Sequence, residues 1–335
     1  RSDIATTNNG IIKATNNGGK GVEIVSIQSG KFVNNGTIGI NGAGGKGINI
    51  TGDNKTGIAG KVENNGTIEV SEGASGIVVS NDNASFVNNE TGKIIATGTN
   101  SKGIDITKGQ AINKGTIVVG KDLETGKVTS QTIGANVNGG SFENKKSIEV
   151  YGENSKGIAV YKGTATNKGT IIAQEKSAAV YLANANGSFI NEENGTIIAD
   201  GKGSKAIQFG ERAKNATNKG IIIVKNSADG VVLTKNKGTI IAQNSADGIF
   251  LSADKIDFTN GEIGKISAIG TGSKAINLNN KGAKATNNGI IEVSGGATAV
   301  ENKGTFINNK TIQGEGIGVK LNNGLLINSG TIDTT

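Results

Sequence analysis

A short motif, Asn-x-Gly-Thr-Ile, returns throughout the chain of 335 residues. About fourteen copies can be recognised, some of them degenerate, and successive copies lie roughly 18 to 31 residues apart. Clear copies begin at Asn34, Asn64, Asn113, Asn167, Asn236 and Asn328. Self-similarity at such a period is the sequence signature of solenoid folds, in which each repeat is one small unit that stacks on its neighbours.

Two further motifs lie between successive copies of the first. The second motif is Ser-Lys-Gly-Ile-x-Ile or a close relative, as at 101–106 and 155–160, and the third is Phe-x-Asn or Ala-Thr-Asn. In each motif apolar residues alternate with other residues, so each short strand has one buried face. The alternation predicts an all-β chain. Because strands this short are unstable alone, they are expected to stack on the strands of neighbouring coils. The expected fold is a parallel β-helix of about fourteen coils with three short strands per coil, forming one repeat domain over residues 1–335.

The composition agrees with this fold. Ile occurs 45 times and Leu only 8 times, which favours strands, because branching at Cβ costs rotamer freedom in helices. Gly (54 residues) and Asn (43 residues) tolerate the left-handed backbone of tight turns, and stacked Asn amides can hydrogen-bond between coils. Pro is absent, as expected where every backbone N–H of an inner coil is needed by its neighbour.

The inward position of the third motif largely alternates between large and small side chains. This alternation allows successive layers to interdigitate, and it indicates that the true repeat is two coils. The residues concerned are Phe32, Val62, Phe86, Ala111, Phe142, Ala165, Phe189, Ala216, Phe258, Ala285 and Phe306.

Missing residue types exclude several kinds of chemistry. The chain has no His and no Cys, which rules out His- or Cys-based nucleophilic triads, disulfides, and zinc, haem or iron–sulfur sites. The segment 42–47 matches Gly-x-Gly-x-x-Gly, but a strand and not a helix is expected to follow, so it does not indicate a dinucleotide site. We expect no catalytic residues, cofactor or metal. No stretch is long and apolar enough to cross a membrane as a helix, and Arg1 in place of Met indicates a piece of a longer protein.

Lysines recur at one turn of the coil, at the start of the second motif. Stacking predicts that they form a longitudinal row, which could attract acidic glycans or could simply be a solvated row interrupted by Asp and Glu. The net charge of +7 comes almost entirely from Lys, and the scarcity of Arg and of aromatic residues argues against nucleic-acid binding. The row comprises Lys20, Lys46, Lys102, Lys156, Lys205 and Lys274.

Residues 121–132 depart from the repeat and are predicted to bulge from the coils as a polar loop. Asp122, Glu124 and Lys127 lie in this stretch. Irregular insertions on a regular solenoid are common recognition sites, so these three residues are candidate ligand contacts, although an insertion without a role is an equal alternative.

Asp229 and Asp247 occupy the same turn position in neighbouring coils. Stacking would bring their carboxylates within about 5 Å, the separation expected of a retaining glycosidase pair. They support an alternative function, a β-helical polysaccharide-degrading lyase or hydrolase. Neither the Arg nor the aromatic residues usual at sugar sites accompany them.

The Asn-Asn-Gly-Thr-Ile and Ser-Lys-Gly-Ile repeats, in a Lys-, Asn- and Ile-rich chain without Cys, resemble the passenger domains of type V autotransporters, in particular the Fusobacterium-type outer-membrane adhesins. The resemblance covers essentially the whole chain. It implies a right-handed β-helix at the cell surface, anchored in the outer membrane of a Gram-negative bacterium through a C-terminal barrel expected outside this segment. The expected function is therefore an extracellular structural and adhesive stalk segment, not an enzyme, that binds a host or bacterial cell-surface protein or glycan.

Overall fold

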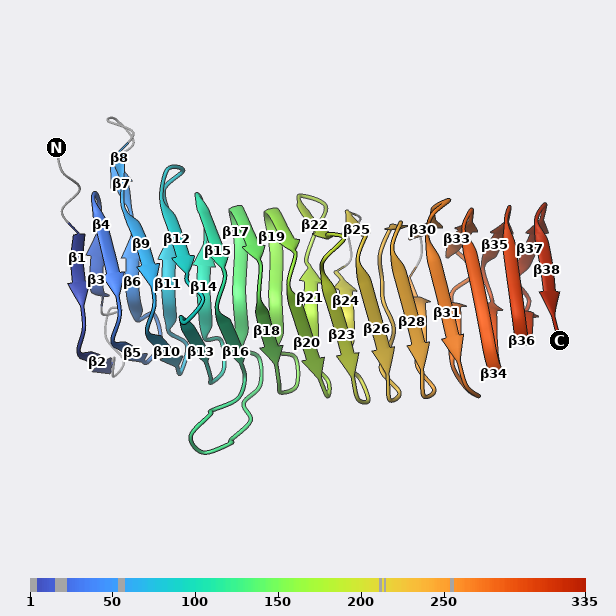
Figure 1. The fold of residues 1–335 in the computed structure, drawn as a ribbon, viewed down its shortest axis with the longest axis horizontal. Coiled ribbons are helices and arrows are strands. Elements are labelled where there is room, and N and C mark those ends of the chain that lie inside the picture. The colour runs from blue at the N-terminus through green and yellow to red at the C-terminus, as the bar shows by residue number, and fades with distance from the viewer. Residues whose placement is uncertain (1–4, 16–22, 54–57, 211–212, 214, 254–255) are drawn as a thin grey trace. The chain divides into compact units, whose positions relative to one another are not determined.

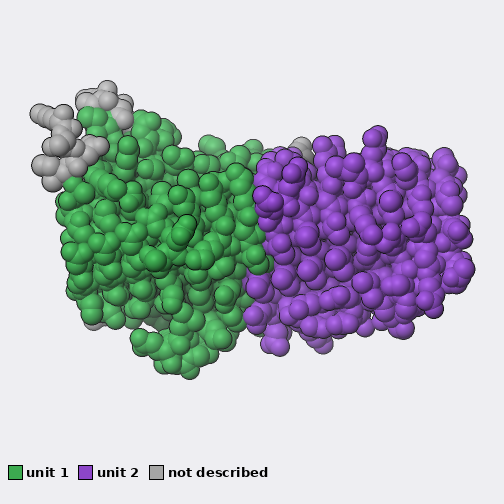
Figure 2. Space-filling view, viewed as in Figure 1, with its two compact units in different colours: residues 1–171, 180–188 green, residues 172–179, 189–335 purple. Residues whose placement is uncertain are grey.

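The computed structural model describes residues 5–15, 23–53, 58–210, 213, 215–253 and 256–335. These residues form strands, turns and bends and contain no helix, so none that could span a membrane. The chain divides into two compact units (Figure 2). Unit 1 comprises Arg1–Ile171 and Val180–Ser188, and unit 2 comprises Ile172–Ala179 and Phe189–Thr335.

In each unit, strands from successive coils pair in parallel and form three stacks, one for each sequence motif (Figure 1). The predicted parallel β-solenoid is therefore confirmed. The described residues form about twelve turns, slightly fewer than the fourteen predicted.

Unit 1 contains the following strands. The first stack consists of β2 (Ile11–Thr15), β5 (Thr37–Asn41), β10 (Thr67–Ser71), β13 (Lys93–Ala96), β16 (Thr116–Val119) and β18 (Ser147–Val150). The second stack consists of β3 (Glu23–Ile27), β6 (Lys46–Ile50), β11 (Ser75–Val79), β14 (Lys102–Ile106) and the first parts of β17 (Ile133–Asn144) and β19 (Lys156–Asn167). The third stack consists of β1 (Ala5–Asn8), β4 (Lys31–Asn34), β9 (Lys61–Asn64), β12 (Ser85–Asn88), β15 (Gln110–Asn113) and the last parts of β17 and β19. Outside the stacks lie the antiparallel strands β7 (Gly52–Asp53) and β8 (Ile58–Ala59).

Unit 2 repeats the arrangement. Its first stack consists of β23 (Thr196–Asp200), β26 (Ile221–Lys225), β28 (Thr239–Gln243), β31 (Lys265–Ile269), the first parts of β34 (Ile290–Asn302) and β36 (Thr311–Leu321), and β38 (Thr331–Thr334). Its second stack consists of β24 (Lys205–Phe209), β29 (Asp247–Leu251), β32 (Lys274–Leu278) and the last parts of β34 and β36. Its third stack consists of β25 (Ala216–Asn218), β27 (Lys235–Asn236), β30 (Asp257–Asn260), β33 (Lys284–Asn287), β35 (Thr305–Asn308) and β37 (Leu325–Asn328). Three strands contain residues of both units: β20 (Thr170–Gln174), β21 (Ala178–Leu182) and β22 (Gly187–Asn191).

The core of each coil is filled by the inward residues of the three stacks. The predicted alternation of large and small side chains in the third stack is confirmed in both units. In unit 1 Ala111 lies in register between Phe86 and Phe142, and in unit 2 Ala285 lies between Phe258 and Phe306. All six side chains are buried. A ring stacked over a methyl group fills each layer without forcing neighbouring rings to overlap.

Asparagines at the end of the third stack form an amide ladder that is buried except at Asn328. Each side-chain Nδ2 donates a hydrogen bond of 2.7 to 2.9 Å to the Oδ1 of the next asparagine. In unit 1 the ladder comprises Asn8, Asn34, Asn64, Asn88, Asn113, Asn144 and Asn167, and in unit 2 it comprises Asn191, Asn218, Asn236, Asn260, Asn287, Asn308 and Asn328.

The predicted hydrogen bonding between stacked Asn amides is thus confirmed, but the predicted left-handed backbone is wrong for this motif. None of the ladder asparagines has a positive φ, and neither does the glycine two residues later in the clear copies, such as Gly66. Gly66 is required for a different reason: a Cβ there would clash with the carbonyl oxygen of Gly36 in the preceding coil. Left-handed backbone occurs instead at the corner before the second stack, for example at Asn100 and Asn154.

Candidate functional site

The candidate lysines of the second stack lie in one row, as predicted, but other residue types interrupt it. Ser75 lies in register between Lys46 and Lys102, and Ile133 lies between Lys102 and Lys156. Lys20 lies outside the described residues. The row is therefore not a continuous line of positive charge.

Two of the three described candidate lysines in unit 1 are neutralised by carboxylates. The Lys46 ammonium lies 2.9 Å from a carboxylate oxygen of Glu23, and that of Lys102 lies 2.7 Å from Asp105. Lys156 differs, because its ammonium lies 4.8 Å from the centroid of the Tyr181 ring. Burial lowers the pKa of Lys156 below its ordinary value.

In unit 2 the predicted acidic pair belongs to the same row as the lysines. The parallel bridge between Val231 and Ile249 places Asp229 beside Asp247, and Asp247 is in turn paired with Lys274. The Lys205 ammonium lies 3.2 Å from Asp229. The order along the row is therefore Lys205, Asp229, Asp247, Lys274, so the positive charges of two lysines are balanced by the negative charges of two aspartates.

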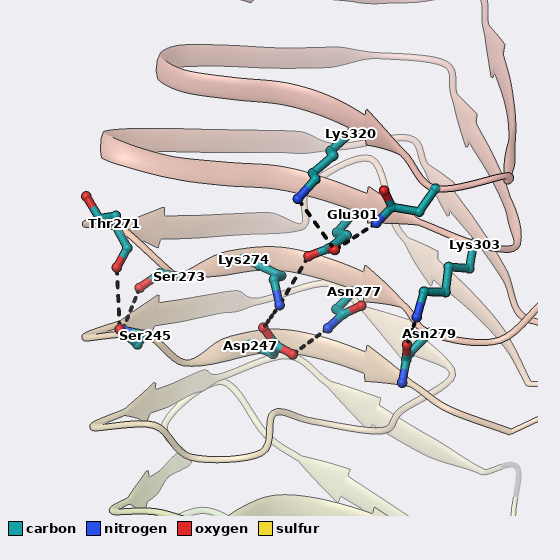
Figure 3. Close-up of polar contacts among 11 residues, drawn as sticks. Ser245, Asp247, Thr271, Ser273, Lys274, Asn277, Asn279, Glu301, Lys303 and Lys320 are labelled. Carbon is teal, nitrogen blue, oxygen red and sulfur yellow. Dashed lines mark hydrogen bonds and ion pairs between the residues drawn. The ribbon is translucent and has the colours of Figure 1, made fainter.

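Asp247 and Lys274 belong to a larger polar network (Figure 3). Lys274 bridges Asp247 at 3.5 Å and Glu301 at 3.2 Å, and Asn277 donates a hydrogen bond of 2.7 Å to the second oxygen of Asp247. Burial raises the pKa of the Asp247 carboxyl, against the hydrogen bonds from Asn277 and Lys274. Asp229 and Asp247 thus occupy the same position in neighbouring coils, as the sequence predicts, and each pairs with a lysine.

The stretch of residues 121–132 projects from unit 1 as a hairpin loop, as predicted. It is the teal-green loop that leaves the coils beyond β16 in Figure 1. An antiparallel bridge joins Lys121 to Val128 at its base, where Lys121 also lies 4.7 Å from the centroid of the Tyr151 ring. The Thr129 hydroxyl accepts a hydrogen bond from the backbone N–H of Gly98. The loop is therefore anchored on the coils at its base.

A local turn shapes the tip of the hairpin. Oδ1 of Asp122 accepts hydrogen bonds of 2.9 Å from the backbone N–H groups of Glu124 and Thr125. The bond from Thr125 is the main cause that holds the pKa of Asp122 below its ordinary value. The carboxylate is consequently charged at neutral pH.

A groove of about 320 Å³ lies between this hairpin and the outer face of the first stack in unit 1. Its floor is formed by β2, β5, β10 and β13, with Lys13, Gly39, Glu69 and Ile95 in successive register. Asp122, Leu123 and Glu124 line it from the hairpin. Lys127, the third candidate residue of the loop, is not among the lining residues.

The groove was not predicted, because it depends on residues at outward positions of the strands. The motif does not specify the outward residue of each strand. In two of the strands it is Gly39, over which the Lys13 side chain lies, and Ile95, which adds a half-buried apolar surface. The available signal was the outward residue in two copies of the motif. It is the last Gly of Gly-Thr-Ile-Gly, which is Gly39, and the second Ile of Lys-Ile-Ile-Ala, which is Ile95. Outward isoleucines recur in unit 2 at Ile198, Ile223 and Ile241.

Coils of three short parallel strands, stacked on a core of alternating rings and methyl groups, define the chain as a parallel β-solenoid domain. Its sequence matches the model of one protein family, the BigA third pectate lyase-like domain, over residues 2–179, just over half of the chain. The chain belongs to this family. No curated protein sequence matches it.

Proposed function

We propose that this domain is an adhesive segment of a bacterial surface protein, displayed outside the cell and without catalytic activity. The observation that carries the proposal is the anchored hairpin at 121–132 with its groove, which breaks an otherwise regular solenoid. A regular coil holds such an insertion at a fixed place on a rigid scaffold, the arrangement that many binding proteins use.

Membership of the BigA third pectate lyase-like family is consistent with a β-helical surface protein. The resemblance of the repeats to type V autotransporter passenger domains adds a location, the outer membrane of a Gram-negative bacterium, with the anchor in another segment. The proposed partner is a cell-surface protein or glycan of a host or of another bacterium, and nucleic acid is not a partner.

A loop replacement tests the proposal. In this variant Asp122–Lys127 is replaced by Asn-Gly, which closes a two-residue hairpin on the bridge between Lys121 and Val128. Fluorescently labelled wild-type domain should bind to host or bacterial cells in flow cytometry, and the loop variant should lose most of that binding. Lys225→Met is the control, because this lysine pairs with Asp200 in the first stack of unit 2 and belongs neither to the hairpin nor to the candidate row. Binding that is absent in the wild type, or equal in the loop variant, argues against the proposal.

The alternative is a β-helical polysaccharide lyase or hydrolase. It is favoured by the pectate lyase-like family description and by the register that places Asp229 and Asp247 in the same position of neighbouring coils. A screen for cleavage of acidic polysaccharides by the wild-type domain tests it. Turnover that disappears in Asp229→Asn or Asp247→Asn would reverse the order of the two proposals.

A further inference from the structure

We infer that the groove beneath the hairpin binds an extended segment of a partner protein that presents a lysine or arginine side chain beside an aliphatic one. The inference rests on the proposed adhesive function and assigns a partner chemistry to its binding site. Three features of the groove carry it: its length, its mixed surface and its charge.

The floor of the groove fits an extended chain. Four consecutive strands, β2, β5, β10 and β13, form it, and three strand spacings give a length of about 14 Å. An extended chain rises about 3.3 Å per residue, so roughly four residues span this length. Gly39 lies in the middle of the floor and contributes no side chain, so that only the flexible, 62% exposed side chain of Lys13 lies over it and must move aside for a side chain of the partner.

The groove offers apolar surface from both of its sides. Ile95 faces outward from the floor and Leu123 lines the groove from the hairpin, where 44% of its surface is exposed. An exposed leucine on an anchored loop, opposite a half-buried isoleucine, provides a contact for one aliphatic side chain. Charged side chains of the partner then extend toward the polar lining.

The charge of the groove is opposite to that of the molecule. Among the lining residues Glu69, Asp122 and Glu124 provide three carboxylates and Lys13 the single ammonium, on a chain whose net charge is +7. Outside the lining, the charge of Lys127 acts on Asp122, so Glu69 and Glu124 are the carboxylates left to a partner. Lys13 and Glu69 pair at 3.5 Å, but their side chains are 62% and 39% exposed, and such exposed pairs are weak. Among the described residues no cation lies within ion-pair distance of the Glu124 carboxylate. A lysine or arginine complements this surface, and an anionic glycan does not.

The probe is the labelled peptide acetyl-Thr-Lys-Val-Arg-Val-Thr-amide, titrated against the full 335-residue chain by fluorescence anisotropy. Its matched control carries norleucine for lysine and citrulline for arginine, which removes charge while keeping shape. The neutral peptide should bind at least about tenfold more weakly than the basic one. Binding of the basic peptide should weaken as salt rises, because the charges are partly exposed.

Variants of the chain then locate the site. Glu124→Gln should weaken binding of the basic peptide by about three- to tenfold. Gly39→Thr should weaken binding by filling the floor. The three atoms nearest to its new Cβ all belong to the flexible Lys13 side chain, which can move aside, so the coil is expected to fold. The control is Glu292→Gln, which removes the same charge from the first stack of unit 2, where Glu292 pairs with Lys265.

The inference is overturned if the norleucine and citrulline peptide binds equally well, or if Gly39→Thr and Glu124→Gln leave affinity unchanged. Tighter binding of an acidic oligosaccharide than of the peptide would also overturn it. Self-association of the wild-type chain that Glu124→Gln abolishes would assign the groove to a second copy. Failure of the folded wild type to bind the peptide, with cell binding intact, would refute only this inference, whereas absent cell binding would refute the proposed function.

Discussion

Asparagine is the residue that most directly ties one coil to the next. A ladder asparagine such as Asn64 is fully buried, accepts a hydrogen bond from Asn34 and donates one to Asn88, each of 2.7 Å. It also donates to the carbonyl oxygen of Gly66, which fixes the corner of its own coil. Buried amides are stable only when their polar atoms are paired, so each ladder residue depends on both neighbours.

The adjacent residue provides an internal comparison. Asn65 also belongs to a ladder, with bonds to Asn35 and from Asn89, but this ladder lies at the surface. Asn64→Ala should lower the free energy of unfolding by about 2–3 kcal/mol, because it leaves buried groups of two neighbours unpaired. Asn65→Ala should lower it by no more than about 0.5 kcal/mol, because water replaces the lost partners.

Guanidinium denaturation of the two single variants, followed by circular dichroism, measures this difference. Equal shifts in the midpoint would show that burial of the ladder adds nothing to its hydrogen bonds.

The sequence predicted that asparagines stack but not why glycine follows them. Periodicity shows that Asn and Gly recur together, and turn chemistry offers left-handed backbone as the usual reason. The actual reason at Gly66 is close approach to the neighbouring coil, a contact between residues 30 positions apart. Such a contact becomes visible only when the register of the coils is known.

At the scale of the element, the third stack depends on the order of large and small side chains. Ala111 is 1% exposed and lies between Phe86 and Phe142. Ala111→Phe would place three rings in successive layers, and overpacking of this kind costs about 1–3 kcal/mol. Phe86→Ala alone should cost about 3–5 kcal/mol by leaving a cavity.

The double variant, Phe86→Ala with Ala111→Phe, should lose less stability than the sum of the two single variants, because the new ring extends into the space that Phe86 leaves. Thermal unfolding of the four proteins measures the coupling. Simple additivity would mean that neighbouring layers do not share their packing space.

The second stack of unit 2 contains a pH-dependent element. Burial alone would raise the pKa of Glu301, but the hydrogen bond and charge of Lys274 outweigh it, and the pKa lies below its ordinary value of 4.5. The charge of Lys320 and a hydrogen bond from Asn322 act in the same direction. The native state therefore binds this proton more weakly than the unfolded state.

The stabilisation by ionised Glu301 should be present above the unfolded pKa and lost as the pH falls through the folded pKa. Glu301→Gln should lower stability at pH 7, and its difference from wild type should shrink as the pH falls from the ordinary value of 4.5 through the lower pKa of the folded state. Urea denaturation across this range measures it. In a Lys274→Met background most of the pH dependence should disappear, and its persistence would assign the effect to other groups.

The hairpin at 121–132 was predictable as an element, because the repeat stops there and resumes afterwards. Its groove was not. The position of Asp122 and Leu123 over β2, β5, β10 and β13 depends on how the loop turns back across earlier coils.

The same limit applies to the row of lysines. The position of each lysine within the motif predicts that the lysines align. Their carboxylate partners lie at several different positions of the coils, and because the coils differ in length these pairs cannot be predicted from the motif.

At the scale of the whole molecule, pairing of lysines with carboxylates keeps the net charge of +7 from being concentrated in the row of candidate lysines. Lys46, Lys102, Lys205 and Lys274 all have carboxylate partners within 4 Å. Long-range attraction to an acidic polymer is correspondingly weak, and at physiological salt it is screened beyond about 8 Å. Composition alone indicates a basic surface, whereas the structure shows that most of these candidate lysines pair with carboxylates, either in the neighbouring coil or, for Lys102, in the same strand.

Each coil in both units contacts its immediate neighbours, so stability should be transmitted locally along the stacks. A substitution that destabilises one coil should therefore lower the local stability most in the coils that pair with it. Asn64→Ala should raise hydrogen–deuterium exchange of backbone amides in β4, β9 and β12, whose strands pair directly. Exchange in β30, β33 and β35 of unit 2 should remain as in wild type.

Peptide-level exchange measured by mass spectrometry at several times resolves these regions. Asn260→Ala, the corresponding change in the ladder of unit 2, is the reciprocal variant, because Asn260 bonds to Asn236 and Asn287 as Asn64 does to its neighbours. It should raise exchange in β27, β30 and β33 and spare β4, β9 and β12. A uniform increase over both units in either variant would mean that the coils open as one cooperative body, and the nearest-neighbour description would then be wrong.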